Sequence, residues 1–177
     1  MPLAPLADAD WPDALAGLRD SFLARANVYR TMAHDPALLA AWSDLRVHVV
    51  QQNALGPELL EVAILRTAHR LGAEYEWAHH VHRARRTGFT DARITALRGP
   101  VEAISDTDRP VAEAVDALTA EARLPEELRD RLLESLGKEA VLDLMATVGF
   151  YSTLAFVVKS FGTPVEADIA AEPPLSP

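Results

Sequence analysis

The residues best suited to chemistry gather in one short stretch of the chain. Four of the six histidines fall within residues 69–82, with acidic and aromatic side chains among them. Imidazole titrates near neutral pH, so it suits proton transfer, above all beside a carboxylate. The stretch holds His69, Glu74, Tyr75, Glu76, Trp77, His79, His80 and His82. It is the densest group of titratable side chains in the sequence and therefore the candidate site.

Helical spacing places Glu76 and His80 one turn apart on the same face, whereas His82 points away from that face. A carboxylate in this position favours the imidazolium and orients the ring, as a general acid or base requires. The same spacing also fits an ordinary surface pair that contributes roughly 0.2–0.5 kcal/mol. We expect His79 and His82 to be exposed or to lie at an interface. Spacing alone leaves both interpretations of the Glu76–His80 pair open.

The elements that must position these side chains are helices. Apolar residues recur at three- and four-residue steps between Pro, Gly and capping residues, and no segment combines β-branched enrichment with alternation. The sequence predicts an all-α multi-helix bundle of about eight helices. We expect helices over residues 12–32, 36–53, 57–72, 74–88 and 91–97, a sixth from residue 110, a seventh over 125–137 and an eighth over 138–160.

A length of 177 residues fits a single domain. We expect an N-terminal arm at residues 1–11, a helical domain at 12–161 and a Pro-rich tail at 162–177 that trails over the surface. The eighth helix, from about Lys138 to Ser160, is apolar nearly all round. Such a helix belongs at the centre of a bundle or between subunits, so we expect a homo-oligomer. The family resemblance described below adds trimers and hexamers to a dimer as the expected assemblies.

Composition argues against several classes of function. A net charge of −9 would repel nucleic acid. The membrane-length stretch from Ala140 to Val158 is interrupted by Asp143 and other polar residues, so we expect a buried helix and no membrane partner. The chain has no cysteine, and Met1–Asp10 has no signal-peptide pattern. We therefore expect a cytoplasmic protein without disulfides or thiolate chemistry.

The region from Pro57 to Leu97 resembles the core of the carboxymuconolactone decarboxylase and alkylhydroperoxidase D-like superfamily. The specific part is a glutamate in one helix, then Gly-x-x-Tyr, then a helix with a histidine. The peroxidase branch has cysteines 12 and 15 residues after the glutamate, and the histidine 4 residues later. In this register Glu61 matches the glutamate and His80 the histidine. Ala73 and Glu76 stand in the cysteine positions.

The loss of both cysteines removes the thiolate that the peroxidase cycle needs. The Glu-Trp-x-x-His pattern at residues 76–80 is similar to the decarboxylase-type branch. Weaker similarity appears at Val148–Tyr151 and Gly162–Glu166. The resemblance implies a decarboxylation or related lyase or isomerase step on a small carboxylated or lactone-type substrate, without metal or cofactor. It implies His80 as acid or base, Glu61 orienting it and Glu76 tuning it.

A substrate carboxylate would need a cation to hold it. Arg66 and Arg70 flank the candidate site in sequence, and either guanidinium could bind an anion in bidentate fashion. Both could equally be ordinary solvated helix positions. We further expect Tyr75 and Trp77 in the wall of the substrate pocket, with His69 as an additional substrate-binding residue.

Two other classes of function stay open. Glu76 and His79 have the Glu-x-x-His spacing of carboxylate-bridged di-iron bundles. Those proteins use two such motifs and this chain has one, so a metal site would have to be shared across a symmetric dimer. The third class is a non-catalytic helical module that binds a ligand or acts as a scaffold.

Overall fold

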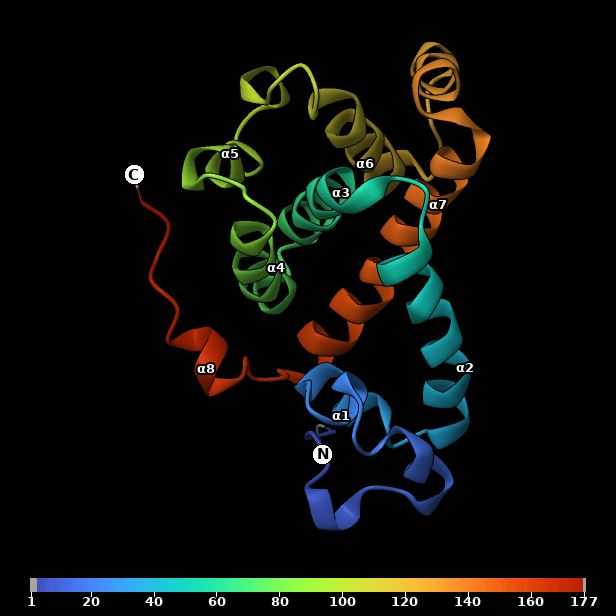
Figure 1. Ribbon diagram of the computed structural model, residues 1–177, viewed down its shortest axis with the longest axis vertical. Helices are drawn as coiled ribbons and strands as arrows, with labels where there is room; N and C mark the ends of the chain where they lie inside the picture. The colour runs from blue at the N-terminus through green and yellow to red at the C-terminus, as the bar shows by residue number, and fades with distance from the viewer. Residues whose placement is uncertain (1–2, 177) are drawn as a thin grey trace.

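The computed structural model describes residues 3–176, and their regular structure is helical throughout (Figure 1), which confirms the predicted all-α fold. The α-helices are α1 (Asn27–Met32), α2 (Pro36–Val47), α3 (Gly56–Leu71), α4 (Glu74–Arg86), α5 (Asp91–Ala96), α6 (Arg109–Glu121), α7 (Glu126–Phe161) and α8 (Ala167–Ala170). The 3-10 helices are η1 (Asp8–Asp10), η2 (Asp13–Leu18), η3 (Phe22–Ala24) and η5 (Val101–Ala103), and a π-helical turn, η4 (His48–Gln52), continues α2.

The hairpin of α3 and α4 carries the candidate site. Every residue from Leu60 to Ala68 is buried, so α3 runs through the interior of the molecule. Gly72 ends α3 with φ +60°, a left-handed conformation that a side chain would disfavour. The chain therefore reverses within two residues and α4 packs back against α3.

Helix α7 crosses the molecule and contacts α1, α3, α4 and α6 (Figure 1). It bends at Gly137, whose φ of 82° and ψ of 166° are not helical, where the sequence predicted one helix to end and another to begin. By length and composition the apolar part of α7 could cross a membrane, but 56% of that window is buried inside the protein. This part serves as a wall for both halves of the core.

The single amphipathic helix predicted for residues 12–32 is wrong. The segment instead forms η2, η3 and the short α1. The Ser21 hydroxyl donates to the Leu18 carbonyl and accepts from the Leu23 amide, so it replaces helical hydrogen bonds with a local turn. The apolar periodicity survives only in part as burial: Leu15, Ala26 and Tyr29 are buried, whereas Leu18 is partly buried and Phe22 is exposed.

The C-terminal segment packs against α1 and α4. In Figure 1 the C-terminal segment leaves α7, passes next to α1 and runs back along α4 towards α5. Contacts along its length agree, since the Asn27 side chain donates to the Pro164 carbonyl and the Ser176 amide donates to Asp91. The predicted tail thus forms an ordered strap, and α1, α4, α7 and the strap surround one cavity.

Candidate active site

Glu61 and His80 form a buried pair between α3 and α4. His80 Nδ1 lies 2.7 Å from Glu61 Oε2, and the two side chains are only 8% and 1% exposed. A carboxylate can only accept a hydrogen bond, so we assign the ring proton to Nδ1, which donates a hydrogen bond to Glu61. His80 also lines the cavity. With Nδ1 engaged, Nε2 is the ring nitrogen left for chemistry in the cavity.

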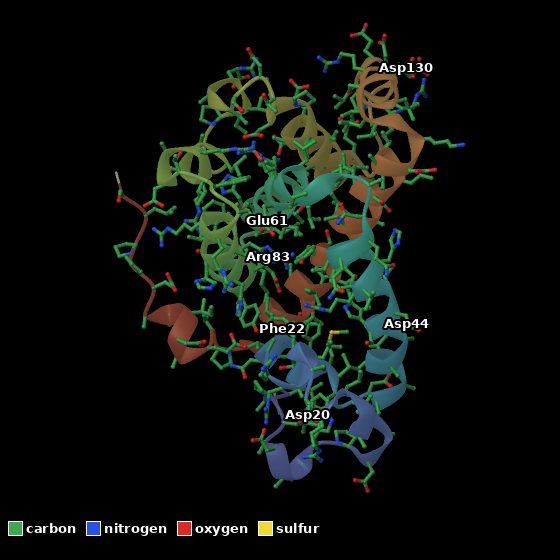
Figure 2. All side chains as sticks on the ribbon, viewed as in Figure 1. Asp20, Phe22, Asp44, Glu61, Arg83 and Asp130 are labelled. Carbon is green, nitrogen blue, oxygen red and sulfur yellow. The ribbon has the colours of Figure 1, made fainter. Side chains whose placement is uncertain are left out.

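Arg83, one helical turn after His80, is a second partner of Glu61. Its Nε lies 2.8 Å from Glu61 Oε1, although the N–H does not point at that oxygen. The guanidinium supplies the positive charge that a buried carboxylate requires. Figure 2 shows Glu61 and Arg83 close together beside the α3–α4 hairpin. The Tyr151 ring meets the His80 ring edge-on at 5.0 Å and fixes its orientation from α7.

The cavity in front of His80 has a volume of about 650 Å³, in the range of small-molecule sites. Its walls come from the N-terminal segment, α1, α2, η4, α4, α7 and α8. Three tyrosines and three arginines stand beside apolar residues in these walls. Among the lining residues are Tyr29, Arg46, Tyr75, Arg83 and Tyr151.

Glu76 lines the same cavity and is fully buried. Burial and the nearby negative charge of Glu166 raise the pKa of Glu76 to about 8. Its Oε1 has no hydrogen-bond partner among residues 3–176. The expected direct pairing with His80 is absent in this described part of the chain, because the imidazole turns to Glu61 instead. Glu76 is therefore a neutral acid at pH 7 that can donate a proton or a hydrogen bond into the cavity.

Glu166 in the strap is the functional residue that the motif spacing missed. Its carboxylate accepts hydrogen bonds from Tyr75 Oη at 2.8 Å, from His79 Nε2 at 2.6 Å and from the Asn27 amide. Burial raises the pKa of Glu166, but these hydrogen bonds outweigh it and lower the pKa to about 2. The weak family similarity at Gly162–Glu166 was the one signal that could have identified it.

His79 and His82 are closer to the site than expected. Both line the cavity, where the expectation was an exposed or interface position. His79 is held by Glu166, and His82 Nδ1 lies 2.8 Å from Glu172. Each imidazole thus ties α4 to the strap. The reason is the strap itself, which covers the face of α4 that would otherwise be open to solvent.

Of the predicted substrate-binding residues, only Tyr75 lines the cavity. Its hydroxyl accepts from the Val28 amide and donates to Glu166, which joins α4 to α1 and the strap. Trp77 lies instead in the core between α3, α4 and α6, with the Arg98 guanidinium 4.0 Å above its ring. Neighbouring helix positions point about 100° apart, so residues 75 and 77 face different sides of α4.

Arg66, Arg70 and His69 also lie away from the cavity. Arg66 is buried and donates to both carboxylate oxygens of Asp116 on α6, and to the carbonyls of Leu97 and Gly99. Arg70 is half-exposed and 3.5 Å from the same carboxylate. Burial, then the nearby positive charges led by Arg66, lower the pKa of His69. These three residues occupy the α6 side of α3, whereas Glu61 faces α4.

The sequence left a metal site open as a second class of function. Among residues 3–176 no three His, Asp or Glu side chains are arranged to hold an ion. His79, one member of the proposed Glu76–His79 ligand pair, directs Nε2 to Glu166.

The comparison with known families and folds agrees with this geometry. The model of the carboxymuconolactone decarboxylase family matches residues 36–122, which include α2, the α3–α4 hairpin and α6. Curated proteins give no match. The hairpin that holds Glu61 and His80 is therefore the part that the family model describes.

Solved structures match nearly the whole chain. The alkylhydroperoxidase AhpD core of a peroxidase-related protein from Ralstonia eutropha JMP134 has a TM-score of 0.81 at 15% identity and covers 96% of this chain and 95% of its own. A peroxidase-related protein from Silicibacter sp. TM1040 gives 0.80 at 15%, with the same coverage. The debrominase Bmp8, in complex with 2,3,4-tribromopyrrole, gives 0.78 at 21%, covering 96% and 94%. Residues 36–122 match the carboxymuconolactone decarboxylase family, and nearly the whole chain has the fold of the alkylhydroperoxidase D-like structures.

Proposed function

We propose that this protein is a cofactor-independent acid–base enzyme of the decarboxylase type, acting on a small carboxylated or lactone-type ring. One observation carries the proposal: the Glu61–His80 pair leaves an imidazole nitrogen in a cavity that also holds the neutral carboxyl of Glu76. An imidazole and a neutral carboxyl in one pocket form an arrangement suited to proton transfer at neutral pH.

The chemistry follows from the two groups. In a decarboxylation the electrons of the bond to the carboxylate carbon pass into the conjugated ring as carbon dioxide leaves. The Glu76 carboxyl then protonates the ring carbon or the enolate oxygen. His80 returns a proton to the site or, in an isomerisation, removes one from the substrate. Glu61 stabilises the imidazolium that forms, as an orienting carboxylate does in other His-based sites.

Thiol-based peroxidase activity is excluded by the sequence, which contains no cysteine. The family match therefore supports the fold and the position of the site, while the reaction is inferred from the side chains present. Among the similar structures is a debrominase whose bound ligand is a small halogenated ring. That ligand supports a ring-sized substrate for the present cavity.

Deuterium incorporation tests the proposal across a whole class of candidate substrates at once. Purified protein is incubated in D₂O with a panel of ring carboxylates and lactones, and NMR follows loss of carbon dioxide and exchange at carbon. We expect at least one compound to react, and His80→Gln and Glu76→Gln to slow it by about 10²–10⁴. His34→Gln is the matched control, since His34 contacts the Ala4 carbonyl outside the cavity.

A panel compound that binds but neither reacts nor exchanges, in the wild type as in the variants, would favour a non-catalytic binding module. Turnover that survives in His80→Gln would place the chemistry elsewhere.

A further inference from the structure

The cavity needs a cation if its ligand is a carboxylate. The two arginines expected from the sequence, Arg66 and Arg70, lie outside the cavity and pair with Asp116. In the described part of the chain, four arginines have no carboxylate partner within ion-pair distance: Arg19, Arg25, Arg46 and Arg86. Arg46 and Arg86 line the cavity. The same cavity wall holds one exposed carboxylate, Asp168, which forms no ion pair with either arginine, so two unpaired guanidinium groups face this cavity in a protein with a net charge of −9.

Arg46 and Arg86 differ in their surroundings. Arg86 is exposed in the last turn of α4, where water screens its charge. Arg46 on α2 is half-buried, and its Nε is shielded from solvent yet has no hydrogen-bond partner among residues 3–176. A buried donor left without a partner is costly unless a ligand satisfies it. Arg46 is thus the stronger candidate for binding an anion.

Two aromatic rings hold the Arg46 guanidinium in place. Its Cζ lies 4.9 Å from the centroid of the Phe22 ring and 5.8 Å from that of Tyr29. Figure 2 places Phe22 in the N-terminal segment below Arg83, where its ring lines the cavity while 43% of the residue stays exposed. Burial raises the pKa of Tyr29, and the positive charge of Arg46 opposes this effect. The Tyr29 hydroxyl also interacts with the guanidinium. The rings attract the cation without neutralising it, so its charge and its unpartnered Nε stay available.

The remaining walls favour a flat ligand. Tyr75, His80 and Tyr151 contribute further rings to the cavity, beside the small or apolar side chains of Ala26 and Val28. Aromatic pairs are most stable in stacked or edge-on arrangements, which a planar ring can form with these walls. An aliphatic chain of the same charge would gain only apolar burial.

We propose that Arg46 is the residue that binds the carboxylate of the ligand, and that the ligand class is a small planar ring bearing that carboxylate. The inference rests on the proposed function only for what happens to the ligand after it binds. It makes Arg46 a specificity-determining residue that neither the family register nor the spacing around His80 identifies.

The test is binding, measured by titration calorimetry or ligand-observed NMR with three probes. Benzoate has the ring and the charge, benzamide is its neutral isostere, and acetate has the charge without the ring. We expect the wild type to bind benzoate at least tenfold more tightly than either of the others. Arg46→Gln should weaken benzoate by about 10- to 100-fold, the worth of one charge-assisted pair, and leave benzamide unchanged within about threefold.

Three variants make the result specific. Arg46→Lys keeps the charge and should recover part of the benzoate affinity, which shows that Arg46→Gln has not simply unfolded the site. Arg86→Gln should weaken benzoate less than Arg46→Gln does. Arg25→Gln removes an exposed arginine outside this cavity and should change nothing.

Equal affinity for benzoate and benzamide, or a benzoate affinity that survives Arg46→Gln and falls in Arg86→Gln, would overturn the proposal. Wild-type affinity for acetate equal to that for benzoate would overturn the planar-ring class. Because no turnover is measured, these outcomes are independent of the acid–base chemistry. A protein that binds benzoate through Arg46 but catalyses nothing would contradict the proposed function alone.

Discussion

At the scale of single residues, Glu76 and Glu166 show how the surroundings give two neighbouring carboxyl groups different pKa values, Glu76 in the cavity wall and Glu166 behind Tyr75 and His79. Glu166 accepts three hydrogen bonds, which lower its pKa to about 2, so it is ionised at neutral pH. Glu76 is buried beside that negative charge, and both effects raise its pKa to about 8, so it keeps its proton at neutral pH. The ionised group positions its neighbours, whereas the neutral one is suited to donate a proton.

The raised pKa of Glu76 predicts a pH-dependent loss of stability. Between its ordinary pKa of 4.5 and about 8, the unfolded chain releases this proton while the folded chain retains it. The contribution is therefore fully present below pH 4.5 and is lost as pH rises through 8. Between pH 5 and pH 9 the free energy of unfolding of the wild type should fall by a few kcal/mol relative to that of Glu76→Gln, because each unit of pKa difference is worth about 1.4 kcal/mol. Urea unfolding at intermediate pH values measures the difference, and parallel curves for the two proteins would contradict it.

Glu61 and His80 could be predicted from the sequence, because a helical hairpin of fixed register brings their positions together. The failures at Arg66 and Trp77 have a common cause. Sequence proximity cannot say which face of a helix meets α6 and which meets the cavity, since the partner Asp116 lies 50 residues further on.

Arg66 is instead predicted to be structural. Replacing it with Met leaves the Asp116 carboxylate and two carbonyls without their buried donor, so the free energy of unfolding should fall by about 3–5 kcal/mol. Arg70→Met is the matched control. It removes a half-exposed arginine 3.5 Å from the same carboxylate and should cost about 0–1 kcal/mol. Chemical denaturation compares the two, and similar losses would show that Arg66 does not hold the core.

At the scale of elements, the helices with clear caps were predictable and the N-terminal segment was not. The start of α5 is capped by Thr90, and Gly72 and Gly162 end α3 and α7 in the left-handed conformation. Residues 12–32 have an equally regular apolar pattern, yet Ser21 diverts the backbone into turns. Periodicity reports which side chains are buried, whereas competing side-chain hydrogen bonds decide whether the helix is continuous.

The strap from residue 163 to 176 is predicted to depend on Glu166. Glu166→Gln weakens the contacts with His79, Tyr75 and the Asn27 amide, so the strap should exchange its amide protons faster at pH 7. Because the folded pKa of about 2 lies below the ordinary 4.5, wild type should keep this stabilisation above pH 4.5 and lose it as pH falls towards 2.

Hydrogen–deuterium exchange read by mass spectrometry follows residues 163–176 directly. Glu113→Gln is the control, since it removes only an exposed ion pair with Arg131. If the strap of Glu166→Gln exchanges no faster than that of the control, Glu166 does not anchor it.

At the scale of the whole molecule, the cavity is assembled from segments far apart in the sequence. The α3–α4 hairpin brings Glu61 and His80, α7 brings Tyr151, α2 brings Arg46 and the strap brings Glu166. Only the hairpin is a local unit with a recognisable spacing. The rest of the site depends on tertiary packing, which is why the sequence pattern predicted Glu61 and His80 but neither Arg46 nor Glu166.

We propose that the outer face of α7 is buried against a second copy of the chain. Leu142 and Phe156 lie on the same side of the helix and are 65% and 61% exposed. Light scattering should therefore give more than one chain of 19.3 kDa per particle. Replacing both Leu142 and Phe156 with Glu should shift the equilibrium towards the monomer. Leu133→Glu, which lies before the bend at Gly137, should leave the particle size unchanged. A monomeric wild type at micromolar concentration would remove this interface.

The most direct test of the central claim is a double-mutant cycle on Glu61 and His80, using the reaction that the deuterium screen identifies. His80→Gln and Glu61→Gln should each lower kcat/KM by about 10²–10⁴ while circular dichroism stays helical. Because the two groups act as a unit, the double variant should lose little more than His80→Gln alone. Losses that multiply, or a His80→Gln protein as active as wild type, would contradict the assignment of this pair as the base of the site.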